Sequence, residues 1–88
     1  VTKPVTPNIS VEKSSENYRI SWNSKEKEKV FRWVLFAKYG ETWETEILEK
    51  ENVFKTLPGN KNGQKLNTVA IKSIDRLSNE SDYDAKQL

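Results

Sequence analysis

The segment Val30-Phe31-Arg32-Trp33-Val34-Leu35-Phe36-Ala37 holds the densest run of large apolar side chains in this chain of 88 residues. Most of its residues are aromatic or β-branched, which favours an extended strand. Apolar side chains stand at both odd and even positions, with Arg32 as the exception. Because successive side chains of a strand point to opposite faces, this pattern predicts a central strand covered on both sides, or one whose outer face meets a partner.

Segments in which apolar and polar residues alternate lie on both sides of this central segment. The clearest alternation places Tyr18, Ile20 and Trp22 on one face of a strand, and turn signals such as Gly40 and Pro58-Gly59 separate the segments. We therefore expect strands near residues 8–12, 17–23, 30–38, 42–48, 52–57, 67–75 and 81–85. Short strands at roughly ten-residue spacing, without a convincing helix, predict an all-β sandwich of two antiparallel sheets with about seven strands.

Three segments need separate interpretation. Residues 42–50 are also compatible with two helical turns, but the β-branched Thr42, Thr45 and Ile47 favour a strand. Residues 23–29 contain no apolar side chain and mix both charges, which predicts a solvated loop and not a basic patch for phosphate. Residues 60–67 are polar, so we expect a loop there too.

The alternating pattern also selects a core. A domain of this length buries only about 60% of the surface that its unfolded chain exposes, so nearly every large apolar side chain is needed for packing. The predicted core consists of Ile9, Val11, Tyr18, Ile20, Trp22, Trp33, Leu35, Leu57, Val69 and Ile71. Residues 1–7, with two prolines, indicate an extended linker segment, and residues 8–88 form the predicted sandwich, which we expect to be a module of a longer protein.

The composition excludes several chemistries. The sequence has no Cys and no His, which removes disulfides, thiolate nucleophiles, ordinary zinc sites and Ser-His-Asp triads. Its 15 basic and 13 acidic residues give a net charge of +2, too weak a field to indicate a nucleic-acid binder. No apolar run approaches the roughly 20 residues that span a bilayer. We expect no cofactor, no nucleic-acid partner and no membrane insertion by this segment.

Carboxylates are the remaining catalytic material. Glu80, Asp82 and Asp84 alternate, so on a strand they would share one face, as a general acid/base pair or a site for a hard cation requires. The segment lacks a calcium-loop pattern and an enclosing apolar pocket, so a solvated terminal strand is the favoured interpretation. Asp75 next to Arg76 is interpreted as a turn-stabilising residue. The isolated domain is therefore predicted not to be an enzyme.

Aromatic residues give the stronger functional hypothesis. Trp33, Phe36, Tyr39 and Trp43 lie on two neighbouring predicted strands, and exposed aromatic rings can stack on sugar rings. The sequence does not decide which face of the strand 30–38 is core. Phe36, Tyr39 and Trp43 are the candidate residues of a ligand or partner surface, although packing of this sheet against its own loops or an adjacent domain is favoured over a glycan platform.

The order of these motifs resembles a fibronectin type III domain over nearly the whole chain. The ending Ser73-Ile74-Asp75-Arg76-Leu77-Ser78-Asn79-Glu80-Ser81 is similar to the A-x-D-R-x-x-N-E-S ending of fibronectin-like modules that follow catalytic domains in secreted bacterial glycoside-hydrolase-like lipoproteins. The other matching segments are Pro7 before Ile9 and Val11, Ile20-Ser21-Trp22, Trp33-Val34-Leu35-Phe36-Ala37, Leu57-Pro58-Gly59 and Val69-Ala70-Ile71-Lys72-Ser73.

The chain departs from this family at one corner. The family usually has Tyr at the position of Val69, where its hydroxyl ties back to the loop after a Leu-x-Pro-Gly turn, and this chain has Leu57-Pro58-Gly59 without the intervening residue. Because Val69 cannot make that hydrogen bond, we expect the segment 60–67 to be mobile.

The resemblance implies an immunoglobulin-like sandwich that serves as a non-catalytic accessory module in an extracellular, cell-surface or periplasmic bacterial protein that acts on carbohydrate. Such a module would space, dock or stabilise a neighbouring domain of the same polypeptide, with its termini at opposite ends of a stiff sandwich. The alternative is direct binding of a polysaccharide or another surface protein through the exposed aromatic surface.

Overall fold

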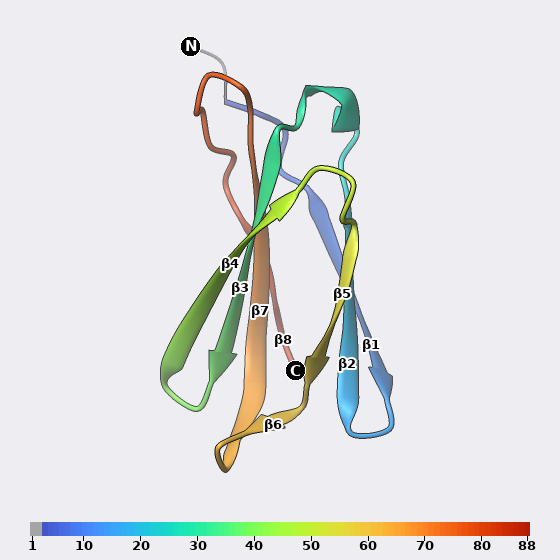
Figure 1. Cartoon of the computed structure of the whole chain (residues 1–88), viewed down its shortest axis with the longest axis vertical. Coiled ribbons are helices and arrows are strands. Elements are labelled where there is room, and N and C mark those ends of the chain that lie inside the picture. Colours follow the sequence, from blue (N-terminus) through green and yellow to red (C-terminus); the bar gives the residue numbers. More distant parts are fainter. Residues whose placement is uncertain (1–2) are drawn as a thin grey trace.

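Two antiparallel sheets face each other in the computed structural model, which describes residues 3–88 (Figure 1). One sheet has the strand order β1-β2-β5; in the other, β4-β3-β7 is extended by β6 and β8, which both pair with β7. The strands are β1 (Asn8–Ser14), β2 (Asn17–Asn23), β3 (Arg32–Tyr39), β4 (Thr42–Glu49), β5 (Phe54–Pro58), β6 (Asn60–Lys61), β7 (Gln64–Ile74) and β8 (Asp84–Gln87). This arrangement confirms an all-β sandwich of two antiparallel sheets.

Each of the seven predicted strands has a counterpart, and residues 42–50 contain a strand and a turn, not a helix. The prediction of a loop over residues 60–67 is wrong, because β6 and the start of β7 form a short hairpin there. Its turn residues Asn62 and Gly63 have φ of 53° and 79°, which is the left-handed geometry of a tight hairpin turn. The segment Asn62-Gly63 is itself a strong hairpin signal that the prediction overlooked.

The loop between β2 and β3 is as polar as its sequence suggests. It contains one short 3-10 helix, η1 (Lys27–Lys29), with no buried residue. Within residues 3–88, no helix is long and apolar enough to cross a membrane.

The strand β3 lies in the middle of its sheet, and its two faces differ in burial. It pairs with β4 on one side and with β7 on the other. Trp33, Leu35 and Tyr39 face the interior between the sheets and join the core, whereas Phe36 lies on the outer face of the five-stranded sheet and is only partly buried. The structure thereby decides which face of this strand is core.

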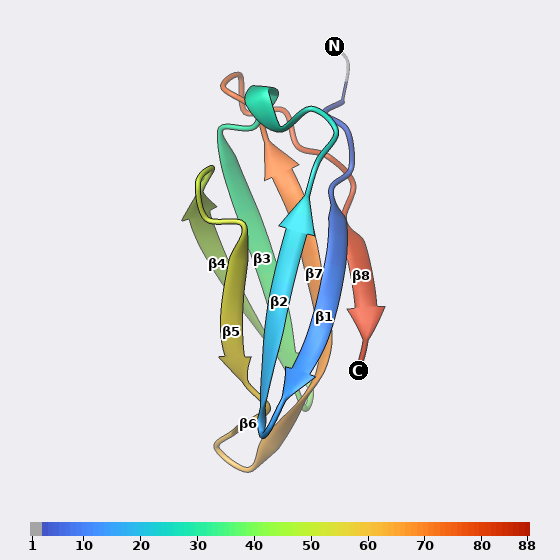
Figure 2. The same cartoon turned by 90° about the vertical axis from the view of Figure 1, so that its right-hand side faces the viewer.

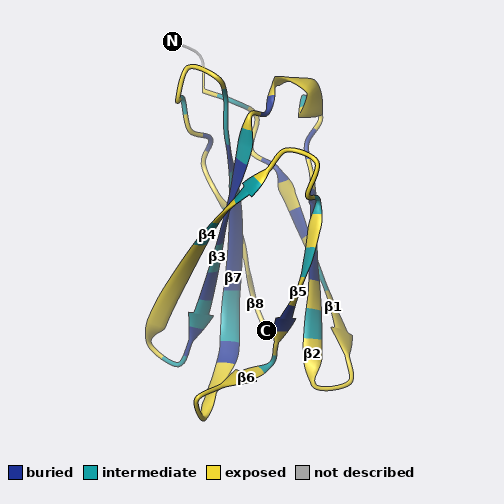
Figure 3. Ribbon diagram, viewed as in Figure 1, coloured by how far each residue is buried: buried dark blue, intermediate teal, exposed yellow. Residues whose placement is uncertain are grey.

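The buried residues follow β2, β3 and β7 most closely (Figure 3). Eight of the ten predicted core residues are buried, and Val11 and Tyr18 are partly buried against the same cluster. Pro7, assigned to the linker by its sequence, is also fully buried. The core contains Ile9, Ile20, Trp22, Val30, Trp33, Leu35, Ala37, Tyr39, Leu57, Leu66, Val69 and Ile71.

Two core tryptophans hold the crossover from one sheet to the other. The indole N–H of Trp22 donates to the carbonyl of Asn52 at 3.0 Å, and that of Trp33 donates to the carbonyl of Lys50 at 3.1 Å. Their ring centroids are 6.5 Å apart. A buried indole N–H needs an acceptor, and these bonds supply one for each tryptophan. They also hold the turn between β4 and β5 in place.

The two open sides of the sandwich are closed by polar contacts. On one side, Glu46 of β4 pairs with Lys55 of β5, and Glu44 pairs with Lys61 at 2.8 Å. On the other side, where β1 and β8 run side by side (Figure 2), the N–H of Ile9 donates to Asp84 Oδ2 at 2.9 Å. Inward-pointing charges on an edge strand such as β4 also discourage pairing with another sheet edge.

Candidate functional site

The three alternating carboxylates near the C-terminus each have a separate structural partner. Glu80 pairs with Lys72, Asp82 pairs with Lys3 at 2.9 Å, and Asp84 accepts the N–H of Ile9. In the part of the chain that the structure describes, no group of three acidic, His or Cys residues could hold a metal ion. The arrangement therefore does not bring these carboxylates together as a chemical site.

Asp75 organises the turn between β7 and β8, as its sequence position suggests. Its Oδ1 accepts the backbone N–H groups of Leu77 and Asn79, both at 2.9 Å, and its Oδ2 accepts the side-chain amide of Asn79 at 3.0 Å. The hydrogen bonds from Asn79, followed by that from Leu77, lower the pKa of Asp75 below its ordinary value. Asp75 is thus a turn-stabilising residue.

Ser81 completes this turn. Its hydroxyl accepts the N–H of Ser73 at 2.9 Å, and its own N–H donates to the carbonyl of Ser73 at 2.9 Å. The polar residues of the segment 73–81 therefore have a physical reason for their spacing: they hold the end of β7 against the chain that leads to β8.

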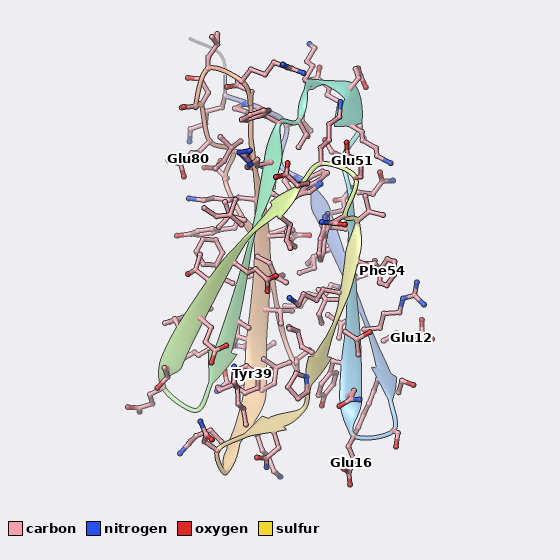
Figure 4. The ribbon with its side chains drawn as sticks, viewed as in Figure 1. Glu12, Glu16, Tyr39, Glu51, Phe54 and Glu80 are labelled. Carbon is pink, nitrogen blue, oxygen red and sulfur yellow. The ribbon has the colours of Figure 1, made fainter. Side chains whose placement is uncertain are left out.

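The three aromatic candidates do not form one surface. Trp43 is 51% exposed and Phe36 is partly buried on the same outer face, whereas Tyr39 is only 4% exposed and lies between the sheets (Figure 4). The assignment of Tyr39 to a ligand or partner surface is therefore corrected. Tyr39 has the same parity along β3 as the core residue Trp33, and this alternation turns its side chain inward.

Tyr39 supplies the tether that Val69 cannot. Its hydroxyl donates to the carbonyl of Pro58 at 2.8 Å, while Val69 is fully buried in the core. Burial, together with the nearby carboxylate of Glu44, raises the pKa of the Tyr39 hydroxyl, and the ammonium of Lys61 opposes this shift. A residue of β3 therefore holds the corner after β5. The resemblance to the family pointed to the position of Val69 on β7 for this role.

A groove on the outer face of the five-stranded sheet is the candidate functional site. Its volume is about 410 Å³. We call it the outer groove; its lining residues are Phe36, Trp43, Thr45, Ala70, Tyr83 and Ala85. The ring of Phe36 meets that of Tyr83 edge to face, with centroids 5.5 Å apart. Aromatic side chains and Thr45 thus surround a floor of two small alanines.

The sequence prediction missed Tyr83, which is 62% exposed. It lies just before β8, and only the pairing of β8 with β7 brings it to Phe36. Ala70 and Ala85 were missed as well, because small residues form a depression only when larger residues stand beside them. An aromatic residue near a chain end was the available signal, but its neighbours depend on long-range pairing.

Four neighbouring rows of cross-strand partners build the outer face, and three of them surround the outer groove; the fourth consists of Glu49, Arg32 and Ile74. The three rows around the groove consist of Trp43, Lys38, Thr68 and Gln87; of Thr45, Phe36, Ala70 and Ala85; and of Ile47, Val34 and Lys72. The ammonium of Lys38 lies 5.7 Å from the Trp43 ring, and that of Lys72 lies 5.5 Å from Phe36 and 5.9 Å from Tyr83. Cations therefore flank the aromatic rings of the outer groove.

The opposite sheet carries a simpler aromatic contact. Phe54 of β5 is 50% exposed, points away from the sandwich (Figure 4), and has the guanidinium of Arg19 4.3 Å above its ring. This pair combines a cation and an exposed aromatic ring as the outer groove does, but on the far side of the molecule. It offers a matched reference for the chemistry of the groove.

Comparison with known proteins identifies similar folds but no family. No family model and no curated protein matches the chain. The spore cortex lytic enzyme SleM of Clostridium perfringens is similar with a TM-score of 0.71 and 13% identity, over 97% of this chain and 28% of that chain. Pectate lyase PelI of Erwinia chrysanthemi, solved with tetragalacturonic acid, is similar with a TM-score of 0.67 and 15% identity, over 92% of this chain and 28% of that chain. The chain thus shares its fold with little more than a quarter of each enzyme.

Proposed function

We propose that this chain is a fibronectin type III-like accessory module, without catalytic activity of its own, in a larger extracellular or surface-anchored bacterial protein that acts on carbohydrate. Its work is to space, dock or stabilise a neighbouring domain of the same polypeptide. In constant-type immunoglobulin domains the fourth strand joins the sheet of the first, second and fifth strands. Here β4 pairs with β3 instead, which supports the fibronectin type.

The observation that carries this proposal is the extent of the structural similarity. Nearly the whole chain corresponds to 28% of a cortex lytic enzyme and to 28% of a pectate lyase. A sandwich that corresponds to about a quarter of such proteins is suited to an accessory role. The separate structural partners of Glu80, Asp82 and Asp84 support the absence of catalysis.

The shape of the molecule suits a spacer. The long axis measures 42 Å, and the start of the described chain and the segment 75–80 lie at one end of it (Figure 1). The N–H of Leu88 donates to Asn67 at 2.8 Å, so the C-terminal residue lies along β7, and the hairpin of β6 and β7 forms the other end. The two ends of the described chain are therefore separated along the long axis, although the C-terminal end stops short of the tip.

Direct binding through the outer groove is a second candidate, favoured by one specific observation. Trp43, which is half exposed, shares a groove with Phe36 and Tyr83. Exposed aromatic groups in a depression are typical of ligand sites. A spacer alone does not require this arrangement.

Two measurements test the accessory role. The isolated chain should show no turnover on a panel of soluble polysaccharides and cell-wall glycans, and turnover that disappears in Glu80→Gln or Asp84→Asn would overturn the proposal. The chain should also be compared with a longer protein that contains its natural flanking sequence. Thermal unfolding should then show a higher midpoint for the neighbouring domain when this module is present; an unchanged midpoint together with unchanged activity on polymeric substrate would contradict the proposal.

A further inference from the structure

We propose that the outer groove binds an anionic polysaccharide, with sugar rings held against Trp43 and Tyr83 and with a sugar carboxylate held by Lys38. This inference rests on the binding candidate of the proposed function and names its ligand class. The groove faces away from the core, so binding needs no rearrangement of the sandwich.

The shape of the groove fits an extended chain of sugars. It crosses four neighbouring strands, from Trp43 on β4, over Phe36 and Ala70, to Ala85 on β8. At about 4.8 Å between strands, the crossing is about 14 Å long. Its volume of about 410 Å³ lies within the roughly 300–1,000 Å³ of small-ligand sites. The groove is therefore long enough for an oligosaccharide segment.

The distribution of charge indicates that the ligand is anionic. Among the described residues, the four rows of the outer face contain three cations, Lys38, Lys72 and Arg32, and one carboxylate, that of Glu49, which pairs with Arg32 at 3.6 Å. The acidic side chains Glu46 and Glu44 of β4 have inner-face positions in the same strand and pair with Lys55 of β5 in the other sheet and with Lys61 of β6. Glu80 pairs with Lys72, so among the described cations of this face Lys38 is the one that no ion pair neutralises, and it gives the groove its net positive charge.

The ammonium groups beside the aromatic rings also argue against a protein as the ligand. A stable protein interface buries about 800 Å² on each partner, and its centre is depleted in charged residues. Here two ammonium groups lie within 6 Å of the aromatic rings at the centre of the face. Groups so placed suit a ligand that combines apolar sugar faces with regularly spaced carboxylates.

Sodium polygalacturonate and its methyl ester are suitable probes, because they share one backbone and differ in charge. Of the three tryptophans, Trp22 and Trp33 are buried and Trp43 is exposed, so quenching of fluorescence by acrylamide reports mainly on Trp43. With the 88-residue chain, polygalacturonate should protect Trp43 from quenching, and the methyl ester should bind at least about tenfold more weakly. Raising the salt concentration should weaken the binding of polygalacturonate.

Matched variants locate the site. Trp43→Ala should reduce the affinity for polygalacturonate, measured by calorimetry, by about tenfold or more. Lys38→Gln should reduce this affinity by several-fold and bring it closer to the affinity for the methyl ester. Phe54→Ala and Arg19→Gln change the corresponding pair on the opposite sheet and should leave the affinity unchanged. Circular dichroism and the unfolding midpoint verify that each variant is folded.

Three results would overturn this inference. They are equal binding of polygalacturonate and its methyl ester, equal binding of poly-L-glutamate, which is a polyanion without sugar, and loss of binding in Phe54→Ala as large as in Trp43→Ala. Absence of binding to polygalacturonate and to a second polyuronate, alginate, would overturn it as well. The accessory role would survive all of these results, because it is tested by the stability and activity of the longer protein.

Discussion

The hydroxyl of Tyr39 donates to the carbonyl of Pro58 and so joins the end of β3 in one sheet to the end of β5 in the other. The donor is almost fully buried, and the acceptor belongs to the turn that leads into the β6–β7 hairpin. One hydrogen bond therefore links both sheets and the start of the hairpin.

Tyr39→Phe should lower the free energy of unfolding by about 1 kcal/mol, because it removes one hydrogen bond and leaves the Pro58 carbonyl without this donor. For a domain of this size, that corresponds to a fall in Tm of about 4–8 °C. Tyr83→Phe is the control: Tyr83 is exposed, so the same atom is removed where water can replace it. Equal effects of the two substitutions in thermal unfolding would contradict the role of Tyr39.

Asp75→Ala should destabilise the chain at neutral pH, and the difference from the wild-type chain should shrink in acid. The pKa of Asp75 is lowered from its ordinary 3.8 in the folded state by the hydrogen bonds from Asn79 and Leu77. Its contribution is therefore fully present above pH 3.8 and is lost as the pH falls through the folded pKa. Unfolding midpoints measured between pH 7 and pH 2 test this, and a constant difference across that range would disprove it.

Asp82→Ala is the matched control for Asp75. Asp82 pairs with Lys3 while both side chains are largely exposed, so the loss of this ion pair should change the midpoint little at any pH.

Asp84→Ala should cost about 1–3 kcal/mol, because it leaves the N–H of Ile9 without its charged acceptor between β1 and β8. Asp84→Asn keeps an acceptor oxygen and should cost less. Urea unfolding of both variants gives the comparison. If Asp84→Asn lowers the free energy of unfolding as much as Asp84→Ala does, the hydrogen bond from Ile9 is not the cause of the destabilisation.

Gly59→Ala should destabilise the chain by about 1–3 kcal/mol through crowding. A Cβ at this position would lie 2.4 Å from the backbone carbonyl oxygen of Glu16, and Gly59 N–H already donates to that oxygen at 2.9 Å. The backbone cannot yield without losing this bond. Asn60→Ala, at an exposed neighbouring position, should have little effect, and similar midpoints for the two variants would refute the steric explanation.

The sequence predicted those features that depend on local alternation. The spacing of Ile20 and Trp22 identified a core strand, and the apolar pattern of residues 30–37 identified a strand in the middle of a sheet; both are confirmed. The exposure of Trp43 also agrees with its prediction as a surface residue.

The features that were missed depend on pairing between distant segments. Tyr39 and Phe36 differ in burial because of their opposite parity on β3, and the parity of the core was not decided by the sequence. Tyr83 and Phe36 are 47 positions apart, and they meet because β8 pairs with β7 and β7 pairs with β3. The short β6–β7 hairpin was missed for a different reason: its turn signal was overlooked in a polar segment.

The contact between β1 and β8 has a mechanical consequence. These strands run side by side in the same direction (Figure 2), with the polypeptide entering β1 near one end of the long axis and leaving β8 farther along it. Tension applied through the two ends of the chain would therefore load this contact in shear. Under such a load the bond from Ile9 to Asp84 and the ladders of both strands must yield together, not one after another. We expect the domain to resist stretching more strongly than its modest core suggests.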